Sequence, residues 1–263
     1  MNLLHITCLA HSLHRVAEKI RDEFKNVDKL IARTKQVFLK APQRIAIYRE
    51  MFPDLKMVPK PTITRWGTWL DAVSFYWENF ESVKTVFIFN ILLFLLFLKV
   101  VDALNPKDAS CISECQKCFN QEVWQDMAYI QSNFGNLSQS ITKLEKQGLT
   151  IQEAMEIFVS VRNDMDFSMG DKADVIRQKF TDIVDKNKAI DTIVKLCQIL
   201  SGKNMDLEIP PNLIPLYKYA SLTSSDVERS FSIYKSILSD KRMSFTLDNL
   251  EKYLICVYNS KND

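Results

Sequence analysis

Cysteine, histidine and acidic side chains are the residues of this sequence that could do chemistry, and two groups of them have a regular spacing. Cys8 and His11 stand three residues apart, which is a metal-ligand spacing, and Cys111, Cys115 and Cys118 would share one face of a helix. A structural zinc site needs four ligands, and neither group has an obvious partner that completes the set. The sequence therefore predicts packing roles for these residues and no metal site. A zinc site stays open as the alternative for the three cysteines.

The composition favours helices and excludes several classes of enzyme. The chain has 263 residues, of which 47% are hydrophobic, 25% are charged and only five are glycine. Phosphate-binding loops and nucleophile elbows depend on glycine, and the sequence contains no G-x-G-x-x-G, G-x-x-x-x-G-K or G-x-S-x-G motif. The formal charge of +2 gives no bulk electrostatic reason to bind nucleic acid. Any such binding must depend on local patches.

The first 85 residues are predicted to begin with a short strand and to continue in helices. An apolar run predicts the strand over Leu3–Thr7, and apolar residues at helical spacing follow from Ser12 to Lys29. A second helix is predicted over about Lys29–Leu39. Three prolines predict a loop over Met51–Pro61, and an aromatic-rich helix is predicted after residue 66.

Residues 86–101 form the most apolar segment of the chain. The run V-F-I-F-N-I-L-L-F-L-L-F-L is shorter than the roughly 20 apolar residues that a bilayer span needs. Three interpretations stay open: a buried core helix, a membrane anchor over 85–101, and a segment foreign to the fold. A retained intron from Phe87 to Val100 would be such a segment, because its removal leaves a smooth continuation from Val86 to Val101.

Residues 102–203 are predicted to be helical throughout. One stretch of apolar residues at helical spacing runs from Trp124 to Leu144. Thr150 and Glu153 have the spacing of a capping box, which predicts that a helix begins there. Two more helices are predicted over Asp171–Asp185 and Ala189–Leu200.

The last 55 residues, 209–263, are predicted to form a proline-containing linker followed by a helical hairpin. Ser225 and Glu228 have the spacing of a second capping box, and Thr246 can cap the final helix. Both helices are amphipathic, and an apolar stripe of this kind needs a partner surface within the chain or on a second copy. The predicted association residues are Val227, Phe231, Tyr234, Ile237, Leu250 and Leu254.

Three motifs occur in a fixed order along the chain: Cys8-Leu9-Ala10-His11, then Arg65-Trp66, then a C-terminal block. The block begins at Ser224 with S-S-D-V-E-R-S-F-S and continues with D-K-R and N-L-E. These motifs resemble those of hAT-superfamily DNA transposases. The first resembles the C-x-x-H element of the family, the second resembles its R-W element, and the block resembles its C-terminal dimerisation region. Between residues 86 and 203 the resemblance includes helices but no motif.

The resemblance implies an RNase H-like core in which three carboxylates hold two divalent ions, Mg²⁺ in this family, for cleavage of phosphodiester bonds. Glu228 would be the third carboxylate. The first two would stand upstream of Cys8, where the sequence contains no Asp or Glu. One carboxylate cannot hold a pair of metal ions against water, so we expect no cofactor and no catalysis. Glu228 is then a vestige of the site, and its helix-capping position explains a glutamate there.

Four residues are candidates for contact with DNA. Trp66 resembles the tryptophan of the family that stacks near a flipped base, and Arg65 precedes it. The alternative for Trp66 is a role in the core beside other tryptophans. Lys241 and Arg242 belong to a basic cluster between the last two helices, which would contact phosphates or form a solvated face.

These observations predict a mainly α protein: a helical bundle with a remnant strand and helix of an RNase H-like core at the N-terminus and a C-terminal helical hairpin. The predicted domains are a core remnant (1–85), the apolar segment (86–101), a helical region (102–208) and a dimerisation region (209–263). The predicted function is protein dimerisation by a catalytically inactive, transposase-derived nuclear chain, with weak DNA binding. Its partner would be a second copy or a related transposase-like chain.

Two other functions stay open from the sequence alone. A longer partner that supplied two carboxylates would complete a transposase or nuclease. A membrane-anchored protein would use residues 85–101 as its anchor, and its localisation would be a membrane and not the nucleus.

Overall fold

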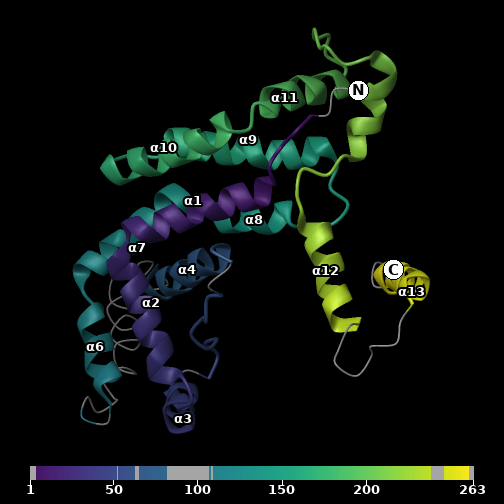
Figure 1. Cartoon of the computed structure of the whole chain (residues 1–263). Helices are drawn as coiled ribbons and strands as arrows, with labels where there is room; N and C mark the ends of the chain where they lie inside the picture. Colours follow the sequence, from purple (N-terminus) through teal and green to yellow (C-terminus); the bar gives the residue numbers. More distant parts are fainter. Residues whose placement is uncertain are drawn as a thin grey trace. The chain divides into compact units, whose positions relative to one another are not determined.

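The computed structural model describes residues 4–51, 53–62, 65–81, 107, 109–237 and 246–260. All regular secondary structure in these ranges is helical, and no strand occurs in them. The mainly α-helical fold class is therefore confirmed (Figure 1). No helix in the same ranges has the length and apolar character that a bilayer span requires. The apolar segment 86–101 lies outside the described residues.

The helices follow one another along the chain in the order shown in Figure 1. They are α1 (Leu9–Glu23), α2 (Lys25–Phe38), α3 (Pro42–Met51), α4 (Gly67–Glu81), α6 (Ser110–Cys118), α7 (Gln121–Phe134), α8 (Leu137–Leu144), α9 (Ile151–Phe167), α10 (Asp171–Asp185), α11 (Ala189–Leu200), the 3₁₀-helix η1 (Pro211–Tyr219), α12 (Ser225–Ile237) and α13 (Leu247–Ser260).

The predicted strand at the N-terminus is not observed. Residues 4–8 have no regular secondary structure, and α1 begins directly after them at Leu9. A strand needs a neighbouring strand for its backbone N–H and C=O groups, and the described part of the chain offers none. The backbone N–H of Leu9 instead donates to the carbonyl of Leu222, at an N···O distance of 3.0 Å.

The first predicted helix ends earlier than its apolar pattern indicates. It breaks at Phe24, with φ −117° and ψ 55°, and not at Lys29, so that α2 begins at Lys25. The Phe24 side chain is buried, with its ring centroid 5.7 Å from that of Tyr129. Packing at this corner thus sets the break, whereas the helical periodicity continues through it.

Three more boundaries differ from the predictions. The sequence indicated no helix over Pro42–Met51, where α3 has only a weak apolar stripe but begins with a proline, as helices often do. The predicted stretch from Trp124 to Leu144 divides into α7 and α8 at Gly135 and Asn136. The predicted proline linker contains η1, because the fixed φ of proline suits a 3₁₀-helix.

The chain divides into two compact units, each built from segments that are far apart in the sequence. The first unit consists of Met1–His11, Leu144–Glu156 and Ala189–Asp263, and the second consists of Ser12–Lys143 and Ile157–Lys188. These units do not follow the boundaries predicted at 85/86, 101/102 and 208/209. Each unit contains helices that pack against one another although they are distant along the chain.

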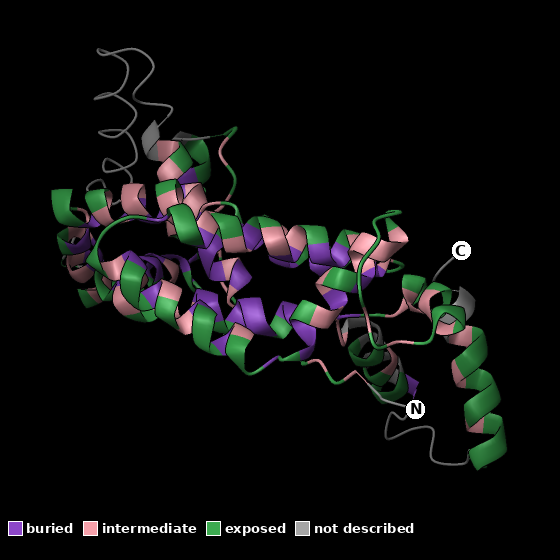
Figure 2. Ribbon diagram, turned by 90° about the horizontal axis from the view of Figure 1, so that it is seen from above, coloured by how far each residue is buried: buried purple, intermediate pink, exposed green. Residues whose placement is uncertain are grey.

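The second unit has the larger buried core. Helix α2 packs against α6, α7, α3 and α4, and α4 packs against α7. These helices carry buried residues, which Figure 2 draws in purple. Each large apolar side chain that is fully buried contributes about 1.5–3 kcal/mol. Members of this core with less than 2% exposure include Leu13, Ile20, Leu30, Phe38, Tyr48, Tyr76, Met127, Phe134 and Phe158.

The first unit joins the start of α9 to α11 and carries the C-terminal hairpin. Buried side chains here include Leu9, Ile151, Ile190, Leu196 and Leu222. Helix α11 contacts η1, and α12 contacts α13. The hairpin itself has few buried side chains in its described part, which leaves most of its apolar residues exposed.

The predicted capping box at the start of α9 is confirmed by its hydrogen bonds. The backbone N–H of Thr150 donates to Glu153 Oε2 at 2.8 Å, and the backbone N–H of Glu153 donates to Thr150 Oγ1 at 3.3 Å. Hydrogen bonds from the Thr150 backbone and then from its hydroxyl lower the pKa of Glu153. Thr246 caps α13 in the same way, because its Oγ1 accepts from the backbone N–H of Asn249 at 3.4 Å.

Loss of the Thr150 cap is expected to destabilise the first unit. Thr150→Ala removes the acceptor for the Glu153 N–H and should lower the free energy of unfolding by about 1 kcal/mol. Urea unfolding followed by circular dichroism measures this change. Thr142→Ala, at an exposed threonine in α8, is the matched control and should change the value by less than about 0.5 kcal/mol. Equal effects of the two substitutions would contradict the capping role.

Candidate functional site

The structure brings Cys8 and His11 next to Ser224 and Glu228, within the first unit. The backbone N–H of Ser224 donates to Cys8 Sγ at 3.2 Å. His11 Nδ1 lies 3.4 Å from Ser224 Oγ, and His11 Nε2 lies 3.5 Å from Glu228 Oε1. The C-x-x-H motif and the glutamate of the C-terminal motif therefore form one cluster, which we call the Cys8 cluster: Cys8, His11, Ser224 and Glu228.

Glu228 accepts a hydrogen bond from Ser224, the residue before its predicted partner Ser225. Ser224 Oγ donates to Glu228 Oε1 at 2.9 Å, and the backbone N–H of Glu228 donates to the Ser224 carbonyl at 3.0 Å. Helix α12 begins at Ser225, so Ser224 occupies the N-cap position. The capping box predicted from residues 225 and 228 stays a prediction, because the side chain of Ser225 lies outside the described part.

The hydrogen bonds of this cluster are mutually consistent when His11 is protonated. The Ser224 hydroxyl has one proton, which it donates to Glu228. It can then accept a hydrogen bond from His11 Nδ1 when this nitrogen carries a proton. Ser224 therefore links the imidazolium to the carboxylate.

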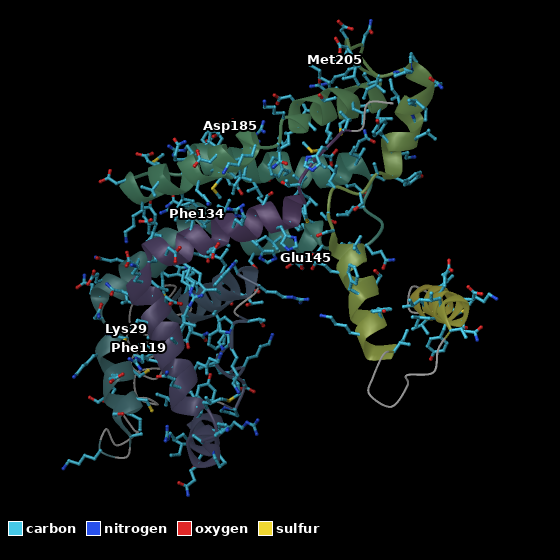
Figure 3. The ribbon with its side chains drawn as sticks, in the orientation of Figure 1. Lys29, Phe119, Phe134, Glu145, Asp185 and Met205 are labelled. Carbon is cyan, nitrogen blue, oxygen red and sulfur yellow. The ribbon has the colours of Figure 1, made fainter. Side chains whose placement is uncertain are left out.

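Electrostatic effects favour the charged forms of both Cys8 and His11. Burial pushes the pKa of the Cys8 thiol upward, but hydrogen bonds from Ser224 and His11 outweigh it, and the pKa lies below its ordinary value of 9.0. The pKa of His11 is raised, first by its hydrogen bond with Cys8, against the opposing effect of burial. The charges of Cys8, Glu228 and Glu145 add to this rise, and Glu145 is labelled in Figure 3.

These shifts have opposite consequences for stability as the pH changes. The raised pKa of His11 stabilises the fold fully below the pKa of an unfolded histidine, about 6.5, and this stabilisation is lost as the pH rises through the folded value. The lowered pKa of Cys8 stabilises the fold above the unfolded thiol pKa, and this is lost as the pH falls through the folded value. The charged form of each group therefore favours the charged form of the other.

The described residues contain no group of three or more His, Cys, Asp or Glu side chains with the geometry of a metal site. Of the three cysteines on α6, Cys115 and Cys118 are buried. Burial raises the pKa of Cys115 to about 12, and its Sγ lies 3.4 Å from Thr34 Oγ1. These two thiols are part of the buried core of the second unit.

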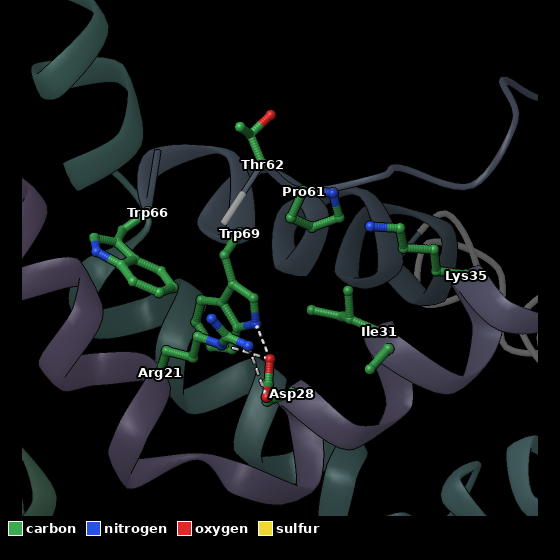
Figure 4. Close-up of a pocket in the computed structure, with 9 residues that line it drawn as sticks. Arg21, Asp28, Ile31, Lys35, Pro61, Thr62, Trp66 and Trp69 are labelled. Carbon is green, nitrogen blue, oxygen red and sulfur yellow. Dashed lines mark hydrogen bonds and ion pairs between the residues drawn. The ribbon is translucent and has the colours of Figure 1, made fainter. Parts of the chain in front are cut away.

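A second candidate site is the pocket beside Trp66 in the second unit, shown in Figure 4. Its volume is about 90 Å³, and its lining includes Trp66, Trp69, Arg21 and Asp28. Asp28 accepts hydrogen bonds from Arg21 Nε at 2.6 Å and from Trp69 Nε1 at 3.0 Å, and these are among the dashed lines in the figure. The Arg21 guanidinium lies 4.9 Å from the centre of the Trp66 ring, a cation–π distance.

The surroundings of Trp66 bear on its two alternative roles, contact with DNA and packing in the core. Trp69 is buried, whereas Trp66 is half-buried and lines the pocket, and Trp77 lies elsewhere with its ring 5.9 Å from Trp124. Arg65, the residue before Trp66, is exposed. The other two candidates for DNA contact, Lys241 and Arg242, lie outside the described residues.

Three of the six predicted association residues are exposed on the hairpin. Phe231 is 60% exposed and Val227 55%, while Tyr234 is 38% exposed. Leu250 and Leu254 of α13 are half-buried. Ile237 differs, because it is only 4% exposed and therefore packs within the structure instead of contributing to a free surface.

The exposed face of the hairpin also contains apolar residues that the predicted set omitted. Leu247 is 85% exposed at the start of α13, and Ile255 and Tyr253 are exposed further along it. Ser224, Arg21 and Asp28 were likewise not predicted as site residues. Of these three residues, only Ser224 could have been found from the sequence, because it directly precedes the start of a helix.

No protein-family model matches the chain, and no curated protein and no solved structure is significantly similar to it.

Replacement of Glu228 is expected to lower the pKa of His11. Glu228→Gln removes a negative charge that faces the imidazole, so the His11 titration should move to lower pH. Histidine NMR signals followed from pH 5 to pH 9 measure the midpoint. Glu251→Gln, at an exposed glutamate of α13, is the control and should leave the midpoint in place. A midpoint that does not respond to Glu228→Gln would show that the two side chains do not interact in solution.

Proposed function

We propose that this chain is a catalytically inactive protein derived from an hAT-type transposase, which associates with a second copy of itself through the hairpin of α12 and α13. The order of the three motifs supports this origin, and so does the contact between the C-x-x-H residues and Glu228. Residues 1–85 would be the remnant of an RNase H-like core, and the nucleus would be the compartment.

The exposed apolar face of the hairpin carries the proposal. Val227, Phe231 and Tyr234 recur at i, i+4 and i+7, which places them on one face of α12. Leu247, Leu250 and Leu254 form a corresponding row on α13. A row of large exposed apolar side chains marks a surface for protein association, since leaving it in water is unfavourable.

A second copy is the occupant that this face fits best. Two like hairpins can pair by a twofold axis, in which the same apolar patch serves both partners. The patch mixes aromatic and aliphatic side chains, and aromatic residues are enriched at the centres of such interfaces. The resemblance places the dimerisation region of the family over these same residues.

The absence of catalysis is proposed for this 263-residue chain by itself. Glu228 would be one of three carboxylates in the family, and its oxygen Oε1 is engaged with Ser224 and His11. These contacts give the glutamate a structural role at the start of α12. A metal-dependent DNA cleavage assay on the isolated chain tests this, and activity with Mg²⁺ would overturn the proposed inactivity.

Charge insertion into the hairpin face is expected to separate the dimer. Phe231→Asp and Leu254→Asp each place a carboxylate where the partner helix would pack, so a particle of two chains should become one of a single chain. Light scattering coupled to size exclusion measures the mass, and circular dichroism confirms that the helices remain. Lys252→Asp, at an exposed polar position of α13, is the control and should leave the dimer intact. A wild-type chain that is monomeric at tens of micromolar would refute self-association.

Weak DNA binding at Arg65 and Trp66 is the second part of the proposal. It rests on the exposed Arg65 beside the pocket that Trp66, Arg21 and Lys35 line. A phosphate contact releases counterions, so removing one should reduce the slope of log K against log salt by about 0.9.

Arg65→Ala is therefore expected to weaken binding to a fluorescent duplex and to flatten its salt dependence by that amount. Fluorescence anisotropy at several salt concentrations measures both quantities. Arg49→Ala, at an exposed arginine of α3, should change neither. The same salt slope for Arg65→Ala and the wild type would exclude a phosphate contact at this residue.

A further inference from the structure

Cys8 lies at a helix N-terminus in a polar environment that favours a thiolate. It directly precedes α1, whose first backbone N–H groups and macrodipole favour negative charge. Its sulfur also accepts the backbone N–H of Ser224 at 3.2 Å, from the start of a second helix. Two helix N-termini therefore supply the positive end of their dipoles to one sulfur atom.

His11 and Glu228 complete the arrangement that activates a nucleophile. A nucleophilic cysteine needs a base within hydrogen-bond reach and a third group that orients the base. The side chain of His11 forms a hydrogen bond with Cys8, and its Nε2 lies 3.5 Å from Glu228 Oε1. Ser224 Oγ connects His11 Nδ1 to the carboxylate. The charged and titratable groups that face this pair are Glu228 and Glu145.

The cluster is accessible to small molecules. Cys8 is half-buried, and the His11 side chain is 60% exposed. The other thiols differ from Cys8 in their surroundings. Burial raises the pKa of Cys115 to about 12 and that of Cys197 to about 11, whereas Cys256 is an exposed thiol on α13.

We propose that Cys8 is a nucleophilic thiolate that hydrogen peroxide oxidises to a sulfenic acid, with His11 as the proton donor to the leaving group. This modification site goes beyond the association function. The sulfur attacks one peroxide oxygen, a new S–O bond forms and the O–O bond breaks. The leaving hydroxide takes the proton of His11 and becomes water. The sulfur is oxidised by two electrons and the peroxide is reduced by two, so the step balances.

Oxidation at Cys8 would act on the start of α12. The thiolate accepts the Ser224 N–H and holds its charge opposite the imidazolium, and the neutral sulfenic acid lacks that charge. Conversion therefore weakens the contacts that join the beginning of α1 to the beginning of α12.

Iodoacetamide alkylation of the full-length native chain tests the thiolate directly. Mass spectrometry of the resulting peptides gives a rate for Cys8 and for the exposed Cys256 in the same sample. At pH 7 we expect Cys8 to react about five- to tenfold faster, because a larger thiolate fraction outweighs its lower intrinsic nucleophilicity. In 8 M urea the two rates should become equal, which shows that the folded structure produces the difference. Equal rates in the native chain would overturn the proposal.

Oxidation by peroxide in two variants and one control variant tests the roles of His11 and Glu228. One equivalent of hydrogen peroxide followed by dimedone, a probe for sulfenic acids, should label Cys8 before Cys256. His11→Gln should slow labelling of Cys8 at least tenfold, Glu228→Gln should slow it less, and Glu251→Gln should have no effect. Circular dichroism checks that each variant is folded. If His11→Gln does not fold, the alkylation rates of the wild-type chain with and without urea test the proposal. Labelling that begins at Cys256, or that does not change in a folded His11→Gln variant, would overturn the proposal.

Discussion

The contact between the residues that open α1 and those that open α12 is the constraint on which the first unit depends. The Leu9 N–H donates to the Leu222 carbonyl, and the Ser224 N–H donates to Cys8 Sγ. Backbone N–H groups at the start of a helix have no partner within that helix, so each segment here supplies what the other lacks. The same two hydrogen bonds place Cys8 and His11 beside Glu228. The Cys8 cluster is therefore a consequence of how two helix starts satisfy each other.

This anchoring also explains how the hairpin can present an apolar face. Helix α12 is held at its first turn by Ser224 and Glu228, while Phe231 and Tyr234, one and two turns further on, are exposed. A surface that is fixed before binding loses less conformational entropy when a partner covers it. The position of Glu228 then links two properties: it caps the helix that we propose to mediate association, and it faces the imidazole that we propose to assist the chemistry of Cys8.

A polar contact at Asp28 joins three helices of the second unit. Asp28 accepts from both Arg21 and Trp69, and it thereby joins α1, α2 and α4. The Arg21 side chain continues to the face of Trp66, so the orientation of this indole depends on the same carboxylate. Hydrogen bonds to charged groups are stronger than neutral ones, contributing about 1.5–3 kcal/mol, which makes Asp28 a fixed point between these three helices.

The sequence by itself determined the helical class, the bounds of α10 and α11, and the caps at Thr150 and Thr246, because helical periodicity and capping are properties of neighbouring residues. It also identified Cys8 and Glu228 as separate motif residues. Only the tertiary structure decided that these two belong to one cluster, that the first helix breaks at the buried Phe24, and that the chain divides into units unlike the predicted domains. These features depend on contacts between segments that are distant in the chain, and local spacing contains no information about which distant segment will pack there.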